Sequence, residues 1–420
     1  MEKLIIDGGL RLSGEMEVHS AKNCVLALLA ASILTDKQVI IHKCPKIADV
    51  MNMIKILKYI GSEVFWQGDT LLLQGDNIKG YEIPSLYAKE IRSSQFLMGA
   101  LLSRLKKSKA SYPGGCDIGI RPIDLHLKGF RALNIKIVDE GGYLICDGEN
   151  ASGGRIHLDF PSVGATENII LASVMLKGKT TITNAAKEPE IVALQEFLNL
   201  MGAKVFGAGT DIIEIEGVNR LNGVEYTPIP DRIVAGTYLI AGAITHGELL
   251  IKNCQPKHFE ALTDKLRYAV SKIKVYQDSV YIKADGENLS IPITETQPYP
   301  GFPTDMQAQI LSLQTVSKGS SLIVENIFET RYKHVPELTK MGANIVVKDK
   351  VVLIRGVKHL HGAEVCAYDL RGGAALVLAG LCASGRTEVG GVKHIDRGYV
   401  KFDEILTSVG AKISRIDDGL

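Results

Sequence analysis

The chain has 420 residues, of which 46% are hydrophobic and 23% charged, a composition typical of folded globular proteins. At about 150 residues per domain, this length predicts two or three domains, and we expect two. The 48 Lys and Arg residues nearly balance the 47 acidic residues, which argues against a nucleic-acid or membrane-surface partner. The first residues alternate like a strand, unlike a signal peptide, and no apolar run near them could span a membrane. We therefore expect a cytoplasmic protein without membrane insertion.

Neither cysteine nor histidine spacing indicates a metal site. The seven cysteines are scattered, which fits reduced thiols better than a disulfide framework, and the ten histidines form no ligand pair at metal spacing. The chain also lacks the glycine-rich Rossmann and P-loop motifs. We expect neither a metal nor a cofactor.

One element recurs six times where a helix ends and a strand begins. Its copies are IGSEV at 60, LNIKI at 133, MGAKV at 201, AVSKI at 269, MGANI at 341 and VGAKI at 409. The starts are 68 to 73 residues apart, and a short strand and a loop precede each copy. The repeating unit is therefore predicted as helix, strand, helix, strand, strand. This pattern predicts an α/β fold.

Six helices rich in small residues, mainly Ala and Gly, precede most of these strands. Small residues let helices approach closely, so we predict that these helices are buried and that the amphipathic ones lie outside. They are expected, in chain order, at residues 21–34, 92–105, 164–176, 231–244, 303–317 and 369–383. Between the third and fourth units, Pro228 and Pro230 break regular structure and predict a crossing between two similar domains of three units each.

The starts of the buried helices are candidates for an anion site. Ser20, Ser162, Asp231, Thr304 and Asp369 are placed to cap their first N–H groups. Helix amino ends carry partial positive charge, so a cleft between the domains that gathered them would attract anions.

Seven cations strengthen this prediction. Four stand at helix starts and three in strand-to-helix loops: Lys22, Arg92, Arg232 and Arg371, then Arg121, Arg331 and Arg397. Together they indicate a ligand with several negative charges. In the alternative interpretation each cation pairs with a neighbouring acid, such as Glu188, Glu190, Asp231, Asp369 or Asp396.

Two further residues are candidates for chemistry. Cys116 lies in a glycine-rich loop near Arg121, where a thiolate would be favoured as nucleophile or proton donor, although it could also be an idle small residue. Asp305 begins a buried helix, where a carboxylate could cap the helix or act as general base on a substrate hydroxyl. His126, beside Asp124, could serve only to hold the loop in shape.

Nine ordered segments carry a resemblance along essentially the whole chain. They are SAKN at 20, PGGCDIGIRPIDLH at 113, SVGAT at 162, NAAKEPEIV at 184, PDRI at 230, FPTDMQAQ at 302, ENIFETRY at 325, DLR at 369 and HIDRGY at 394. The sequence resembles the UDP-N-acetylglucosamine 1-carboxyvinyltransferase family. The resemblance implies a two-domain inside-out α/β barrel with three repeats per domain. One domain would span 22–229, the other 1–21 with 230–420, and the active site would lie in the interdomain cleft.

The resemblance also implies a reaction. The sugar 3-hydroxyl of UDP-N-acetylglucosamine attacks C2 of phosphoenolpyruvate, a proton reaches C3, and phosphate leaves from a tetrahedral intermediate. This is the first committed step of peptidoglycan precursor synthesis, so cell wall biogenesis, cell shape and cell division depend on it. Two alternatives are 5-enolpyruvylshikimate-3-phosphate synthase, which lacks the PGGC loop, and a non-catalytic protein that binds anionic sugars.

Family roles carry over by position. The implied catalytic residues are Cys116, Asp305, Lys22 and Arg397, with Asp305 as base and Cys116 as a proton donor that also adds covalently to phosphoenolpyruvate and is alkylated by fosfomycin. The implied phosphoenolpyruvate contacts are Lys22, Asn23, Arg121, Arg371 and Arg397. The implied UDP-sugar contacts are Asn23, Arg92, Arg121, Pro122, Ile123, Asp124, Leu125, Ser162, Val163, Gly164, Asp305 and Ile327. The expected supporting residues are Glu188, Glu190, Asp231, Arg232, Arg331 and Asp369. Phe160 and Phe96 depart from some relatives, which carry Lys and Trp there, and put individual uridine contacts in doubt.

Overall fold

The computed structural model describes residues 2–88, 90–112, 123–270 and 272–417. The described residues form two compact units. The central unit lies between Ser20 and Ile229, and the terminal unit combines Met1–His19 with Pro230–Leu420. The chain passes from the terminal to the central unit after His19 and returns between the end of β14 at Tyr226 and the start of α8 at Arg232.

Each unit carries three four-stranded sheets among its described residues. The strands of each sheet are given in spatial order. The first sheet of the central unit is formed by β14 (Val224–Tyr226), β3 (Val39–Ile41), β5 (Thr70–Gln74) and β4 (Glu63–Gln67). The second is formed by β6 (Glu82–Ile83), β7 (Lys107–Ser111), β9 (Tyr143–Asp147) and β8 (Lys136–Glu140), and the third by β10 (Arg155–His157), β11 (Lys179–Thr183), β13 (Ile212–Glu216) and β12 (Lys204–Phe206). The first sheet of the terminal unit is formed by β2 (Ser13–Glu17), β15 (Glu248–Lys252), β17 (Val280–Lys283) and β16 (Lys272–Val275). The second is formed by β18 (Ile293–Glu295), β19 (Ser320–Val324), β21 (Val351–Arg355) and β20 (Asn344–Lys348). The third is formed by β22 (Glu364–Cys366), β23 (Arg386–Gly390), β1 (Glu2–Asp7) and β24 (Lys412–Asp417).

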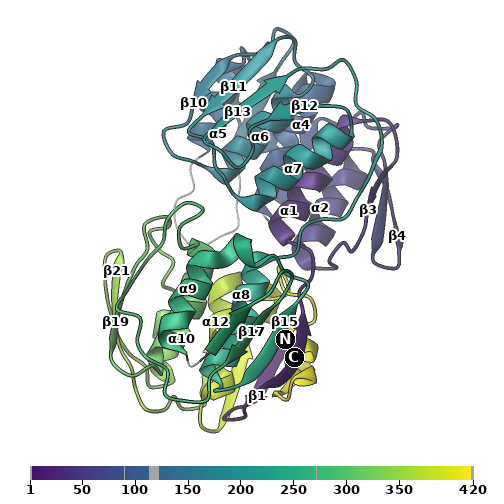
Figure 1. The fold of residues 1–420 in the computed structure, drawn as a ribbon. Helices are drawn as coiled ribbons and strands as arrows, with labels where there is room; N and C mark the ends of the chain where they lie inside the picture. Colours follow the sequence, from purple (N-terminus) through teal and green to yellow (C-terminus); the bar gives the residue numbers. More distant parts are fainter. Residues whose placement is uncertain (1, 89, 113–122, 271, 418–420) are drawn as a thin grey trace. The chain divides into compact units, whose positions relative to one another are not determined.

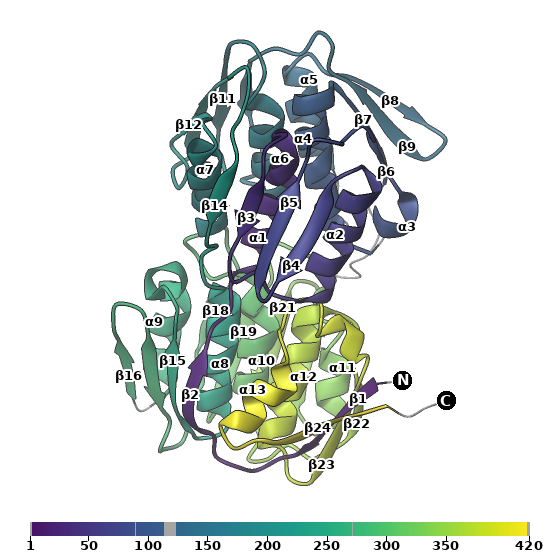
Figure 2. The ribbon, with the colours of Figure 1, turned by 90° about the vertical axis from the view of Figure 1, so that its right-hand side faces the viewer.

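All six sheets share one plan. The first two strands pair in parallel, and the remaining pairs are antiparallel. The predicted five-element unit is present, but it omitted the parallel edge strand of five sheets, such as β6 or β10, because two or three residues carry no clear alternation. The N-terminal strands complete the terminal unit: β2 pairs with β15, and β1 pairs with β23 and β24. In Figure 2 the purple strand β1 lies beside the yellow strand β24.

The predicted buried helices are confirmed. They are α1 (Lys22–Ala31) with η1 (Ser32–Leu34), η2 (Arg92–Gln95) with α4 (Phe96–Leu105), α6 (Val163–Ser173), α8 (Arg232–Ile244), η4 (Thr304–Met306) with α10 (Gln307–Thr315), and α12 (Leu370–Cys382). From its second residue to its last, α8 is buried at every position, as the density of Ala and Gly predicts. At Gly236 an added Cβ would lie 2.6 Å from a methyl of Leu262, so a larger residue there would force the packing apart.

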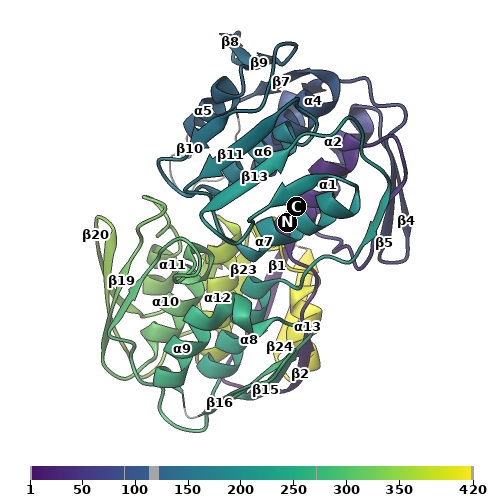
Figure 3. The same cartoon turned by 45° about the horizontal axis from the view of Figure 1, so that its top comes forward.

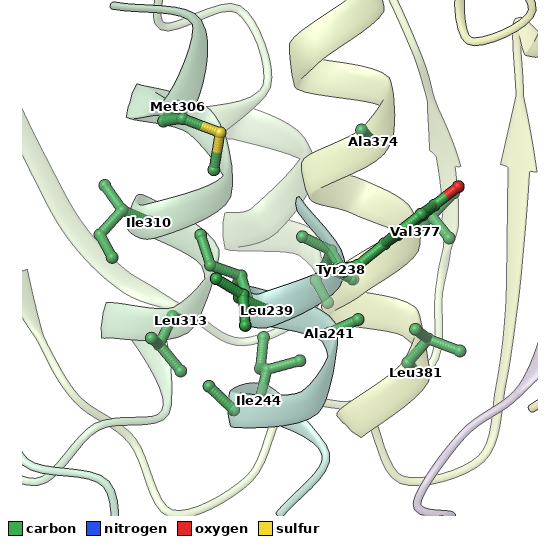
Figure 4. Close-up of a cluster of buried hydrophobic side chains, with 14 of the residues drawn as sticks. Tyr238, Leu239, Ala241, Ile244, Met306, Ile310, Leu313, Ala374, Val377 and Leu381 are labelled. Carbon is green, nitrogen blue, oxygen red and sulfur yellow. The ribbon is translucent and has the colours of Figure 1, made fainter. Parts of the chain in front are cut away.

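In the terminal unit, α8, α10 and α12 pack directly on one another, and strands β15 and β17 cover α8 (Figures 1 and 3). Leu239, Ile310 and Val377, one from each helix, are fully buried where the three meet (Figure 4). Strand residues complete the core through their inward side chains: Leu249 and Ile251 of β15 are buried, whereas Glu248 and Lys252 are exposed. Helices inside and sheets outside give the inside-out α/β barrel architecture that was predicted.

The amphipathic helices end at the repeated motif. They are α2 (Ala48–Tyr59), α5 (Asp124–Ala132), α7 (Pro189–Leu200), α9 (Glu260–Ala269), α11 (Val335–Lys340) and α13 (Phe402–Ser408); the remaining short helices are α3 (Ser85–Ala88), η3 (Pro256–Phe259) and η5 (Val392–His394). Gly61, Gly202, Gly342 and Gly410 follow four of them with φ between 94° and 108°, and Asn134 follows α5 with φ of 60°. The motif recurs because a positive φ ends the helix there, and Gly or Asn adopts it at least cost. Among the described residues, no helix is long and apolar enough to cross a lipid bilayer.

Candidate active site

Acidic caps organise two helix starts of the terminal unit. One carboxylate oxygen of Asp231 accepts hydrogen bonds from the amides of Ile233 (2.9 Å) and Val234 (3.0 Å) at the start of α8. Asp369 does the same for the amides of Arg371 (3.0 Å) and Gly372 (2.9 Å) at the start of α12. These two predicted caps are confirmed, as is Ser162, whose hydroxyl accepts from the amide of Ala165 at the start of α6.

One predicted cap is wrong, and another lies one residue before the capping position. The residue before α1 is Ala21, whose side chain makes no capping hydrogen bond, and Ser20 precedes it. Thr304 lies inside the short helix η4, and its hydroxyl is used elsewhere: it donates to Glu325 Oε2 (2.8 Å) and accepts from Arg331 Nη1 (2.8 Å).

Asp305 joins two buried arginines. Its Oδ1 accepts from Arg331 Nη2 at 2.7 Å, and its Oδ2 accepts from Arg371 Nη2 at 2.9 Å and Nε at 3.2 Å. The arginine side chains are 3% and 4% exposed, whereas that of Asp305 is 26% exposed. The carboxylate thus sits at the surface of a buried cationic pair. The start of α10 shows no side-chain cap, so these ion pairs replace the capping alternative for Asp305.

This triad carries a net positive charge, since two guanidinium groups face one carboxylate. Burial opposes the charged form of Arg371, but the charge of Asp305, with smaller contributions from the Tyr399 hydroxyl and the charge of Asp231, outweighs burial and raises the pKa of its guanidinium. Arg371 therefore stays charged. A permanently cationic group at a helix start suits a phosphate or carboxylate ligand.

Glu325 holds the neighbouring loop, and sequence reasoning missed it. Its Oε1 accepts from the amides of Ile327 (2.9 Å) and Phe328 (3.1 Å) and from the Thr296 hydroxyl (2.9 Å), and the residue is fully buried. Phe328 in turn lies against Arg331, whose guanidinium carbon is 5.4 Å from the ring centre. The signal in the sequence is the segment ENIF, in which an acid precedes by two and three residues the loop amides that its side chain binds.

The other cations of the terminal unit are less enclosed. Arg232 opens α8 with its guanidinium carbon 5.6 Å from the centre of the Tyr299 ring, and both residues line a cavity of about 110 Å³. Arg397 lies half-buried in the loop before α13. Its neighbour Asp396, an alternative partner for the cations, instead binds Arg415 through contacts of 2.8 and 2.9 Å.

In the central unit, Lys22 is the first residue of α1, and its Nζ lies 3.1 Å from Oδ2 of Asp49. Asp49 is buried in the first turn of α2 and was not predicted. Asn23 follows Lys22 and is half-buried. The lysine is thus oriented by an acid outside the predicted alternatives.

Buried hydrogen bonds connect α6 to the helices α5 and α4. The Asn168 side-chain amide donates to His126 Nδ1 (2.9 Å), and its oxygen accepts from the amide of Gly99 (2.8 Å), so it links α5 to α4. Burial and the charge of Arg92 lower the pKa of His126 to about 3, and the imidazole is neutral. Gly164 lies against its ring, since an added Cβ would be 3.4 Å from Nε2. His126 therefore contacts the first turns of α6. The loop that it was expected to hold in shape lies largely outside the described residues.

The predicted supporting acids Glu188 and Glu190 stand at the start of α7 and are buried. They approach Glu167 of α6, which is 1% exposed. Burial, and then the charges of Glu190 and Glu188, raise the pKa of Glu167 well above its usual value. Among the residues that the structure describes, no group of His, Cys, Asp and Glu side chains could hold a metal ion.

Comparison with known proteins assigns this arrangement to a family. The family model described as EPSP synthase (3-phosphoshikimate 1-carboxyvinyltransferase) matches residues 6–406. The chain is 51% identical to UDP-N-acetylglucosamine 1-carboxyvinyltransferase 2 of Caldanaerobacter subterraneus subsp. tengcongensis, over 99% of this chain and 100% of that protein. It is 46% identical to UDP-N-acetylglucosamine 1-carboxyvinyltransferase 1 of Carboxydothermus hydrogenoformans, over 99% of each chain. The chain belongs to the enolpyruvyl transferase family.

Solved structures of enolpyruvyl transferases share the fold. The enolpyruvyl transferase NikO from Streptomyces tendae superposes with a TM-score of 0.87 at 24% identity, over 99% of this chain and 98% of that one. EPSP synthase from Acinetobacter baumannii gives 0.75 at 17% identity, over 99% of this chain and 100% of that one. At these identities the likeness concerns architecture alone.

Some predicted site residues of this enolpyruvyl transferase lie outside the described ones. They are Cys116, Arg121 and Pro122. Directly after them, Ile123 is buried, Asp124 is exposed and Leu125 is half-buried at the start of α5. Val163 and Gly164 form the half-buried first residues of α6. Phe96 lies near Gly164, with its Cε1 3.5 Å from an added Cβ there, whereas Phe160 is exposed.

Proposed function

We propose that this enolpyruvyl transferase moves the enolpyruvyl group of phosphoenolpyruvate to the 3-hydroxyl of UDP-N-acetylglucosamine and releases phosphate. Relatives at 46 and 51% identity, matched over 99% of this chain, bear the name of that activity. The observation that carries the proposal in the structure is the Asp305 carboxylate held by Arg331 and Arg371. This arrangement places a proton acceptor beside permanent positive charge. The addition of the sugar hydroxyl needs the proton acceptor, and both the addition and the elimination of phosphate need the positive charge.

The triad supplies two functions in the proposed addition. The partly exposed Asp305 carboxylate accepts a hydrogen bond from the sugar 3-hydroxyl, removing its proton as the oxygen bonds to C2 while C3 takes a proton. Arg331 and Arg371 hold the carboxylate in orientation and offset the negative charge of the ligand. In the elimination, the C2–O bond to phosphate breaks, C3 loses a proton and the C2–C3 double bond re-forms. The proton that C3 gains in the addition is thus matched by the one that it loses in the elimination.

Four cations, one of which is Arg371 of the triad, are assigned to phosphoenolpyruvate. We propose that Lys22, Arg121, Arg371 and Arg397, with Asn23, bind its phosphate and carboxylate. The buried Asp49 orients the Lys22 ammonium through its 3.1 Å contact. Preorganised charge of this kind stabilises a transition state without reorganisation at the moment of reaction.

The start of α6 is assigned to the diphosphate of the sugar nucleotide. The hydroxyl of Ser162 uses one lone pair on the amide of Ala165, and the half-buried Val163 and Gly164 follow it at the positively polarised helix end. The neutral His126 beneath Gly164 avoids a buried charge there. Arg92, Arg121 to Leu125, Asp305 and Ile327 complete the proposed UDP-sugar contacts.

Cys116 is proposed as the proton donor to C3 and as the residue that fosfomycin alkylates. Peptidoglycan precursor synthesis, and with it cell shape and division, is the proposed pathway. The competing assignment is 5-enolpyruvylshikimate-3-phosphate synthesis, because the matching family model is described by that activity. The identity to proteins named for the UDP-sugar reaction favours the first assignment.

Phosphate release separates the assignments. Purified protein is incubated with phosphoenolpyruvate and either UDP-N-acetylglucosamine or shikimate 3-phosphate, and phosphate and the enolpyruvyl product are measured. Phosphate release and a product of the expected mass with the UDP-sugar alone support the proposal. Turnover with shikimate 3-phosphate instead would reverse the assignment, and binding without turnover of either pair would indicate a non-catalytic protein.

A further inference from the structure

Arg371 has a second partner on the side away from Asp305. Its Nη1 donates to the hydroxyl of Tyr399 at 3.4 Å, and its guanidinium carbon lies 5.7 Å from the centre of the Tyr399 ring. Both residues are buried, at 3% and 1% exposure. Nε and Nη2 face Asp305 while Nη1 faces Tyr399, so contacts on two sides fix the planar guanidinium.

The Tyr399 hydroxyl belongs to a buried polar cluster. Its oxygen lies 2.9 Å from Oγ1 of Thr237, and Gln309 Nε2 lies 3.4 Å from the tyrosine oxygen and 3.3 Å from the threonine oxygen. Thr237 and Gln309 are both fully buried. They come from α8 and α10, whereas Arg371 comes from α12, so the cluster connects the three central helices of the terminal unit.

The hydrogen-bond directions follow from the donors available. Thr237 donates its only hydroxyl proton to the carbonyl of Ile233 (2.8 Å), because a carbonyl can only accept. Its oxygen must therefore accept from Tyr399, which makes the tyrosine the donor at 2.9 Å. The lone pairs of the Tyr399 oxygen are then left to accept from Arg371 and Gln309. Thr237 thus turns the tyrosine so that an acceptor faces the guanidinium.

From this geometry we propose that Tyr399 is a positioning residue for Arg371, set in direction by Thr237 and Gln309. The inference rests on the proposed function for its kinetic consequence, because Arg371 would bind phosphoenolpyruvate. The contact is long, and its contribution is therefore orientation of the guanidinium and not strong binding. When a group that binds the reacting molecule is even slightly misoriented, the rate of the reaction falls strongly.

The chain offers a matched control in Tyr238. Its ring also lies against Phe402, with centres 6.4 Å apart, compared with 4.6 Å for Tyr399. It is equally buried, but its hydroxyl has no hydrogen-bond partner among the described residues. Tyr399→Phe and Tyr238→Phe therefore remove the same atom from the same core, and only the first touches the arginine.

The experiment compares steady-state kinetics and thermal midpoints of both variants. Tyr399→Phe should lower kcat/KM for phosphoenolpyruvate by about 10-fold or more, leave KM for UDP-N-acetylglucosamine unchanged and fold normally, while Tyr238→Phe should leave both constants unchanged. In an Arg371→Lys background, the effect of Tyr399→Phe should largely vanish. Equal losses in both variants, an unchanged kcat/KM in Tyr399→Phe or full additivity with Arg371→Lys would overturn the proposal.

A readout independent of turnover keeps this inference separate from the proposed function. In protein with ¹⁵N-labelled arginine, the Nε–H resonance of Arg371, assigned by its loss in Arg371→Lys, should shift and exchange faster with water in Tyr399→Phe and not in Tyr238→Phe. If the wild type showed no turnover, the proposed function would fail, yet this comparison would still decide the inference. An unchanged resonance in Tyr399→Phe would overturn it.

Discussion

The Asp305 carboxylate and the Arg371 guanidinium meet through two N–H groups, with Oδ2 of Asp305 2.9 Å from Nη2 and 3.2 Å from Nε. A related pair lies on the surface between Asp7 and Arg386, where Nε is 2.9 Å from Oδ1 and Nη2 is 3.3 Å from Oδ2. Both arginines use the same two nitrogens, but Arg386 contacts both oxygens of its acid, whereas Arg371 contacts one and leaves the other to Arg331. The pairs also differ in burial: the Arg371 side chain is 4% exposed and that of Arg386 is 63% exposed. The surface pair therefore provides internal controls for the buried one.

Replacement of the arginine tests the guanidinium geometry. Arg371→Lys keeps the positive charge but cannot make a two-point contact, so kcat/KM for phosphoenolpyruvate should fall by about 10²-fold. Arg386→Lys should leave kinetics unchanged, since exposed ion pairs contribute little. Steady-state phosphate release for both variants checks this, and equal activity of the two variants would contradict a role for Arg371.

Replacement of the carboxylate separates chemistry from stability. Asp305→Asn removes the proton acceptor and should lower turnover by at least about 10²-fold while UDP-N-acetylglucosamine still binds. It also leaves two buried guanidinium groups without their counterion, so unfolding should become easier by about 1–3 kcal/mol. Asp7→Asn should change neither quantity. Urea unfolding and isothermal titration measure both effects, and normal turnover in Asp305→Asn would show that the carboxylate serves only the ion pairs.

Fosfomycin should modify Cys116 and none of the described cysteines. Burial raises the pKa of Cys44 and Cys254 to about 12 and that of Cys146 to about 11, so these thiols are protonated and enclosed. Cys366 is half-buried, and burial followed by the charge of Glu337 raises its pKa too. Mass spectrometry should find the adduct in wild type and in Cys366→Ser but not in Cys116→Ser. An adduct that persists in Cys116→Ser would contradict the assignment.

The sequence predicted what depends on neighbours along the chain. Dense Ala and Gly identified the buried helices, and Asp231 and Asp369 were identified as caps because a cap binds amides two or three residues away. Partners distant in sequence could not be predicted in this way. Asp49 lies 27 residues from Lys22, and Tyr399 lies 162 residues from Thr237, so only tertiary packing brings them together.

Thr304 illustrates a second limit of sequence reasoning. A threonine before a buried helix is a common cap, yet Glu325 and Arg331 take up its hydroxyl. Both partners come from the segment after the next strand, β19. The local signal was sound, and tertiary contacts overrode it.

The buried Glu167 predicts how stability depends on pH. Its pKa is raised above the usual 4.5 by burial and by the charges of Glu190 and Glu188, so the folded state favours the neutral acid. The stability that this preference contributes is fully present below pH 4.5 and is lost as pH rises through the raised pKa, because the unfolded chain then ionises freely. Glutamine is neutral at every pH, so Glu167→Gln should gain stability relative to wild type as pH increases from 5 to 8.

Urea unfolding of both proteins across this range measures the gain. Glu216→Gln, which alters an exposed carboxylate 3.1 Å from Lys204 on the same unit, should show no such trend. The turnover of Glu167→Gln should stay near that of the wild type, because the side chain packs behind the start of α6 and is 1% exposed. A stability difference that stayed constant from pH 5 to 8 would contradict a raised pKa of Glu167 in the folded protein.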